Sequence, residues 1–133
     1  MQYVVALFVA LTLNATANLL MKAGMKPVQE SGGILRDGAV AAVKTVLVSK
    51  TLMLGLICFA ANAAFYMYAL QSRALKISIA YPIMVGGGFA LIAVVARLHP
   101  ALAETLTWGQ IVGIVMVLGG IVLIASQMDM SVA

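Results

Sequence analysis

The sequence predicts an all-α, polytopic membrane protein, and three observations support this fold class. Hydrophobic residues make up 64% of the 133 residues and charged residues only 9%, whereas about a quarter of a soluble domain is charged. The mean hydropathy is +1.11. Four charge-free apolar runs are each about 20 residues long, the length at which a helix crosses a hydrocarbon core. We therefore expect one four-helix transmembrane domain over residues 1–133, with spans at residues 3–21, 51–70, 77–96 and 106–125.

The first span carries a polar stripe. It lacks a basic region ahead of its apolar core, so we expect a retained span and not a signal peptide. Asn14, Asn18 and Lys22 are four residues apart and share one face of a helix. Asn14 lies at mid-membrane depth, where a polar side chain is costly unless it faces a partner helix or a wet cavity. Two interpretations stay open: the stripe lines a substrate pathway, which Asn18 and Lys22 favour, or the amides only join helices.

A long connection, residues 23–50, separates the first two spans. Four helix-breaking residues predict that the first helix ends here: Gly24, Pro27, Gly32 and Gly33. Residues 34–49 are apolar but carry charges, so we expect a short helix lying on the membrane surface. The alternative is a tilted extension of the second span, in which Lys44 and Lys50 would have to snorkel to the interface.

The second span has a similar stripe, because Cys58, Asn62 and Tyr66 are also four residues apart. Cys58 is the only cysteine in the sequence, which excludes an intramolecular disulfide. The loop at residues 71–76 is short, so we expect the second and third spans to be antiparallel neighbours.

Three consecutive glycines, Gly86, Gly87 and Gly88, lie at the centre of the third span. In soluble helices each costs about 1 kcal/mol relative to alanine. Two interpretations stay open: a hinge, favoured because the three glycines cover several helix faces, or close packing of another helix.

The fourth span, residues 106–125, has a flat face. Gly109, Gly113 and Gly120 are spaced so that a partner helix can approach closely, which predicts a dimer interface. His99 lies in the preceding loop without a second histidine, so no metal site is expected there.

Charge and motifs narrow the function classes. The formal net charge of +4 comes from basic residues between the apolar runs, so we expect contact with anionic lipid headgroups and not with nucleic acid. The sequence has no nucleophile–base pair, metal-ligand set or phosphate loop, so we expect neither an enzyme nor a cofactor.

The basic residues at the first and third connections outnumber those at the second: Lys22, Lys26, Arg36, Lys44, Lys50 and Arg97, against Arg73 and Lys76. This bias predicts that the first and third connections are cytoplasmic and both termini outside.

Several motifs resemble those of the small multidrug resistance proteins and the wider drug/metabolite transporter superfamily. They are Leu20-Met21-Lys22 at the end of the first span, the sequence IAYPI at residues 79–83, and the pattern E-x-L-T-x-x-Q-x-x-G at residues 104–113. The resemblance covers all four spans. It implies a dimer, often antiparallel, in which the fourth helices hold the subunits together and the first helices meet at a central substrate site.

The resemblance also implies roles for particular residues. Tyr66 and Tyr81 match aromatic positions of the family, and Gly86 and Gly88 match its mid-span glycines. Where the multidrug members have a proton-binding glutamate, this chain has Asn14. An amide cannot carry a proton, and none of the four acids in the sequence lies in a predicted span, so proton-coupled cation exchange is disfavoured.

A second branch of the superfamily also lacks that glutamate. The chain resembles its small paired subunits, which are similar to flippases for aminoarabinose linked to undecaprenyl phosphate. The resemblance implies a phosphate near Lys22 and a sugar hydrogen-bonded to Asn14, Asn18 and Asn62. We therefore expect an inner-membrane, flippase-like transporter of an amphipathic, anionic lipid-linked substrate in bacteria, acting as a homodimer or with a related four-span subunit. The alternatives are a proton-coupled exporter of drugs or metabolites and a non-transporting partner subunit.

Overall fold

The computed structural model describes residues 1–30, 32–33, 38–73, 75–98 and 105–127. The described residues form five helices: α1 (Gln2–Glu30), α2 (Ala39–Val48), α3 (Lys50–Ala69), α4 (Ile77–Leu98) and α5 (Trp108–Ala125). All but α2 are long and apolar enough to cross a membrane. The predicted all-α, four-span fold with one additional short helix is therefore confirmed, and the chain is a multi-pass membrane protein. His99 and the charged residues Arg36, Asp37, Glu104 and Asp129 lie outside the described residues.

The first helix is longer than predicted. We expected Gly24 and Pro27 to end it, but α1 continues through both to Glu30, so this expectation was wrong. Gly24 is instead a point of close packing, because a Cβ there would lie 2.7 Å from Cδ2 of Leu52. Proline is tolerated within membrane helices where neighbouring groups satisfy the freed backbone. The chain turns only at the glycines beyond, where Gly33 has φ of 99° and its amide donates to the Val28 carbonyl at 3.0 Å.

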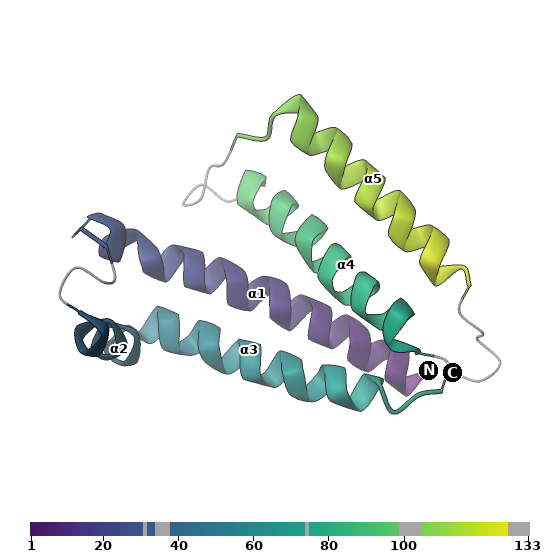
Figure 1. Cartoon of the computed structure of the whole chain (residues 1–133), viewed down its shortest axis with the longest axis horizontal. Helices are drawn as coiled ribbons and strands as arrows, with labels where there is room; N and C mark the ends of the chain where they lie inside the picture. The colour runs from purple at the N-terminus through teal and green to yellow at the C-terminus, as the bar shows by residue number, and fades with distance from the viewer. Residues whose placement is uncertain (31, 34–37, 74, 99–104, 128–133) are drawn as a thin grey trace.

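The short helix α2 is separate from α3. Ser49 lies between them with extended backbone angles (φ −76°, ψ 109°). Its amide donates to the Thr45 carbonyl at 3.1 Å, and its hydroxyl oxygen accepts from the Leu52 amide at 3.4 Å. α2 runs across the ends of α1 and α3 and not along them (Figure 1). α2 is therefore a separate helix that does not continue the helix of the second span. Its placement on the membrane surface stays a prediction, and its entry into the membrane as a tilted extension stays the alternative.

The spans are arranged in the order α3, α1, α4, α5 (Figure 1), because α1 packs against both α3 and α4, and α5 packs against α4. We expected α3 and α4 to be neighbours, but α1 lies between them, so this expectation was wrong. Residues 70–73 and 75–76 lie near the N-terminal end of α1, where Leu75 is 1% exposed and joins Leu7 in the core. A short loop can cross a helix end when one of its side chains is buried against that end.

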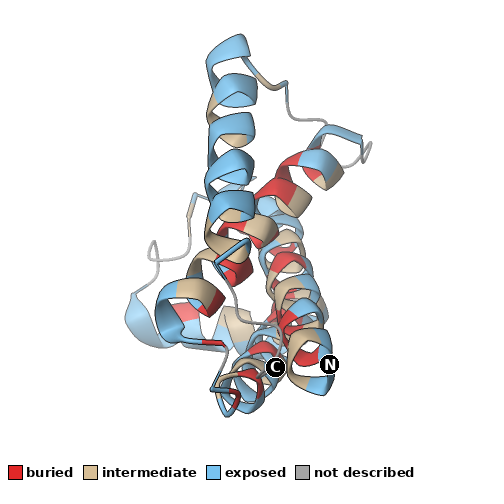
Figure 2. Ribbon diagram, turned by 90° about the vertical axis from the view of Figure 1, so that its right-hand side faces the viewer, coloured by how far each residue is buried: buried red, intermediate tan, exposed pale blue. Residues whose placement is uncertain are grey.

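The last span is attached only along one side. α5 begins with a capping box, in which the Thr107 amide donates to Oε1 of Gln110 at 2.8 Å and Oγ1 of Thr107 accepts from the Gln110 amide at 3.4 Å. None of the residues of α5 is buried, and Figure 2 shows this helix exposed along its length. The core instead gathers where α1, α3 and α4 converge, around Leu7, Leu75 and Met84.

Candidate functional site

Glycines set the register between α1 and α3. A Cβ on Gly55 would lie 3.2 Å from the Ala17 carbonyl oxygen and 3.1 Å from Cγ of Met21, and Gly24 contacts Leu52 in the same antiparallel pairing. Such small residues let the backbones of membrane helices approach closely. Continuing this register by two turns brings Asn62 of α3 to the level of residues 13–14 of α1. Asn62 and Asn14 therefore lie at about the same depth along the two spans.

Asn14 points toward α4. Its Nδ2 lies 3.1 Å from where a Cβ on Gly88 would be, and the side chain is partly buried. Asn18 donates through Nδ2 to the Asn14 carbonyl at 2.8 Å and to Oδ1 of Asn14 at 3.4 Å. The two amides thus support each other along the helix, so Asn18 does not need a partner helix to satisfy this donor.

The rest of the α1 stripe is accessible. Asn18 and Lys22 are exposed on the side of α1 that carries Asn14, and α4 diverges from α1 toward this end (Figure 1). Asn14 therefore lies where α1 contacts α4, and Asn18 and Lys22 extend the stripe along an exposed side of α1. This arrangement is compatible with either sequence interpretation, a substrate pathway or a contact with a second subunit.

Two buried polar atoms of α3 lack partners. Asn62 is 5% exposed, and its Oδ1 has no hydrogen-bond partner within the described part of the chain. The same holds for the buried hydroxyl oxygen of Tyr66, one helical turn away. An unsatisfied buried polar group costs about 1–3 kcal/mol, so such a pair is an unfavourable arrangement for a purely structural helix face. Both residues were predicted from their four-residue spacing.

Tyr81 completes the predicted set from α4. Its side chain is 54% exposed, whereas that of Tyr66 is partly buried. The six predicted binding residues therefore differ in exposure: Asn62 is buried, Asn14 and Tyr66 are partly buried, and Asn18, Lys22 and Tyr81 are exposed.

The three mid-span glycines all lie close to neighbouring helices. A Cβ on Gly86 would contact Cδ1 of Ile121 of α5, and one on Gly87 would lie 2.5 Å from Cδ1 of Leu11 of α1. Both atoms are the ends of flexible side chains that can shift. Gly88 faces Asn14, and α4 is helical throughout this stretch. The contacts are compatible with the packing interpretation, and both packing and the hinge stay predictions.

The glycines of α5 have the opposite environment. No described atom outside the local helix lies within 4 Å of a Cβ built on Gly109, Gly113 or Gly120. Their flat face is therefore not covered by any of the described residues, as a dimer interface would require, and the dimer itself stays a prediction.

One feature was not predicted from the sequence: a groove between the last turns of α1 and the helix α2, lined by residues that include Pro27 and Ser49. It was missed because Gly24 and Pro27 were interpreted as helix breakers, which placed this part of the chain in a loop. The signal that could have revealed it is the seven-residue spacing of Ala10, Ala17 and Gly24, which predicts a close-packed face extending beyond residue 21.

No family model, curated protein or solved structure matches this chain.

Proposed function

We propose that this protein is a small flippase-like transporter that moves an amphipathic, anionic lipid-linked substrate across a bacterial inner membrane by alternating access. The observation that carries the proposal is the buried, unpartnered pair of Asn62 Oδ1 and the Tyr66 hydroxyl. Polar groups inside a membrane domain are costly and mark substrate pathways. A sugar hydroxyl could donate to the amide oxygen and accept from the phenol, which would satisfy both atoms.

The preference for an anion follows from charge. No Asp or Glu occurs within α3, α4 or α5, and the acid of α1, Glu30, is its last residue. A cationic substrate would therefore lack a counter-charge among the spans. Lys22, on the same face as Asn14 and Asn18, supplies a positive charge at the exposed end of the stripe. This favours a phosphate at the interface with a sugar held deeper, and it disfavours proton-coupled cation export.

The transporting unit would be a dimer. A single chain surrounds its polar stripe on one side only, and the glycine face of α5 is open among the described residues. Pairing through α5, with a second copy or with a related four-span subunit, would enclose the stripe. This architecture follows the resemblance to the small multidrug resistance proteins and uses no cofactor or catalytic residue.

A flipping assay tests the proposal. The full-length protein is reconstituted into vesicles with a fluorescent, sugar-bearing polyprenyl phosphate, and protection of the dye from a membrane-impermeant quencher is followed over time. We expect flipping by the unchanged protein and its loss in Asn14→Leu, with dimer mass preserved in native mass spectrometry. Thr16→Leu is the matched control, because Thr16 is exposed and bonds to the Thr12 carbonyl of its own helix at 2.8 Å.

The other outcomes distinguish the alternatives. Loss of the dimer in Asn14→Leu would support the interpretation that the amide only joins helices. Flux of small cations without lipid movement would support an exporter. Absence of any flux, with stable binding to a second membrane protein, would support a partner subunit.

A further inference from the structure

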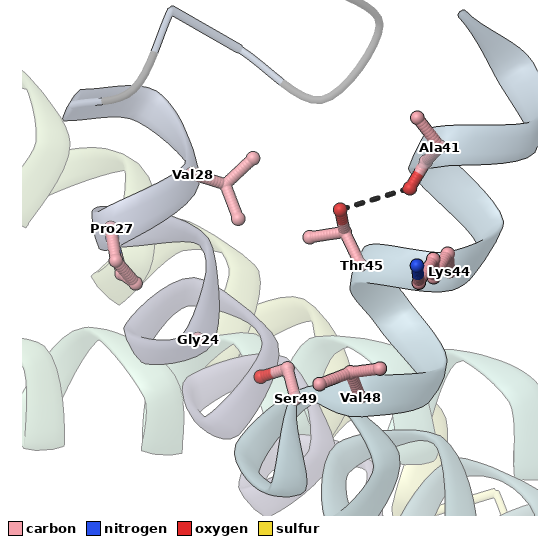
Figure 3. Close-up of a pocket in the computed structure, with 8 residues that line it drawn as sticks. All are labelled: Gly24, Pro27, Val28, Ala41, Lys44, Thr45, Val48 and Ser49. Atoms are coloured by element: carbon pink, nitrogen blue, oxygen red, sulfur yellow. Dashed lines mark hydrogen bonds between the residues drawn. The ribbon is translucent and has the colours of Figure 1, made fainter. Parts of the chain in front are cut away.

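A groove of about 470 Å³ lies between the last turns of α1, the helix α2 and the junction of α2 with α3 (Figure 3). We call it the α1–α2 groove. Its lining is mostly apolar, with one charged side chain and two hydroxyls, and it includes Pro27, Val28, Lys44, Thr45, Val48 and Ser49. The groove is distinct from the polar stripes, since its lining includes none of the stripe residues Asn14, Asn18, Lys22 and Asn62.

Two contacts hold the walls apart. Gly24 packs against Leu52 and ties α1 to the first turn of α3. Ser49 then turns the chain by its extended backbone, so that α2 leaves at an angle to α1. Ser49 is also the N-cap of α3, where its hydroxyl oxygen accepts from the Leu52 amide, and the Thr45 hydroxyl donates to the Ala41 carbonyl of α2 at 2.9 Å. The polar side chains of the groove are thus held by hydrogen bonds to the helices on which they lie.

The outer face of α2 indicates the depth of the groove in the membrane. Val40, Val43 and Leu47 are 86%, 60% and 61% exposed, and their spacing places them on one side of the helix. We expect an apolar face of this kind, on a helix that crosses the ends of the spans, to be buried at the boundary between headgroups and acyl chains. Lys44 is exposed beside this face and also lines the groove. With α2 at this boundary, the groove would be accessible to lipid headgroups.

The charge of this end of the bundle is positive. Besides Lys44, the described residues here include Lys22 and Lys26 near the end of α1 and Lys50 at the start of α3, and the described acid is Glu30. Each basic residue near an anionic membrane surface contributes about 1 kcal/mol of attraction. The groove thus combines apolar walls and the lining residue Lys44 with a positively charged end of the bundle, which matches a lipid that has a negatively charged headgroup.

We propose that the α1–α2 groove binds the phosphate headgroup of an anionic membrane lipid. The Lys44 ammonium contacts a phosphate oxygen, and the Ser49 hydroxyl, whose oxygen already accepts from Leu52, donates to another. The Thr45 hydroxyl proton is used by the Ala41 carbonyl, so Thr45 contributes shape only. Pro27, Val28 and Val48 cover the first carbons of the lipid chain. This binding does not require that the bound lipid is transported, so it can hold even if the flippase proposal fails.

The test uses the full-length protein in detergent, titrated with phosphatidylglycerol or phosphatidylcholine and analysed by native mass spectrometry. We expect phosphatidylglycerol to be retained in preference to phosphatidylcholine. Lys44→Gln should weaken this retention about fivefold, the factor that one basic residue supplies near an anionic surface, whereas Lys44→Arg should preserve it. Lys76→Gln is the matched control, because Lys76 is exposed immediately before α4, at the opposite end of the bundle.

Three results would overturn the proposal. The first is equal retention of phosphatidylglycerol by Lys44→Gln and the unchanged protein. The second is an equal loss of retention in Lys76→Gln. The third is displacement of phosphatidylglycerol by millimolar inorganic phosphate, which would mean that the apolar walls take no part and that the site accepts free phosphate. Helix content by circular dichroism shows whether the variants remain folded.

Discussion

Replacing Asn62 by leucine should stabilise the protein and stop transport. Asn62 is 5% exposed and its Oδ1 is unpartnered among the described residues. Leaving such a group buried costs about 1–3 kcal/mol, and leucine has a similar size and a higher helix propensity. We therefore expect the free energy of unfolding to rise by about 1 kcal/mol or more. Gains of this kind at the expense of activity are typical of functional polar sites.

The assay measures both properties on the same preparation. Unfolding in detergent is followed by the helical circular dichroism signal during titration with a denaturing detergent, and flipping is followed in vesicles. Ala63→Leu is the matched control, because Ala63 is the next residue of α3 and is exposed; it should change neither property. Tyr66→Phe, which removes only the hydroxyl oxygen, should likewise reduce flipping without loss of stability.

Two outcomes would refute this reasoning. If Asn62→Leu loses stability together with transport, the amide oxygen has a partner in the assembled protein and the residue joins helices. If the variant gains stability and still flips lipid at the original rate, the buried polar pair is not part of the substrate site.

Two further predictions concern the glycines. Gly55→Ala should lower the free energy of unfolding by about 1–3 kcal/mol, the usual range for overpacking, because its Cβ would lie 3.2 Å from the Ala17 carbonyl oxygen. Gly119→Ala, with no described neighbour within 4 Å, should not lower the free energy of unfolding and should raise it by up to about 1 kcal/mol, the helix propensity that alanine gains over glycine. Gly113→Leu should abolish the dimer in a crosslinking assay while helix content is preserved, and an intact dimer would remove α5 from the interface.

The polar residues show how far sequence reasoning reached. Four-residue spacing correctly grouped Asn62 with Tyr66, since spacing on a helix is a local property. It also grouped Asn14 with Asn18 and Lys22, but it could not show that α4 covers only Asn14. Burial depends on which helix lies alongside, and Asn62 and Asn18 have identical side chains in opposite environments.

The sequence by itself determined the all-α class, the four spans and the separate short helix, because hydropathy and length alone decide whether a helix can satisfy its backbone within a bilayer. Tertiary structure decided the rest. In the folded chain, α1 continues past Gly24 and Pro27 to Glu30, and the close packing of Gly24 against Leu52 outweighs the local helix-breaking tendency. Tertiary structure also placed α1 between α3 and α4 and opened the α1–α2 groove. These features depend on contacts between residues distant in the chain, which no local pattern records.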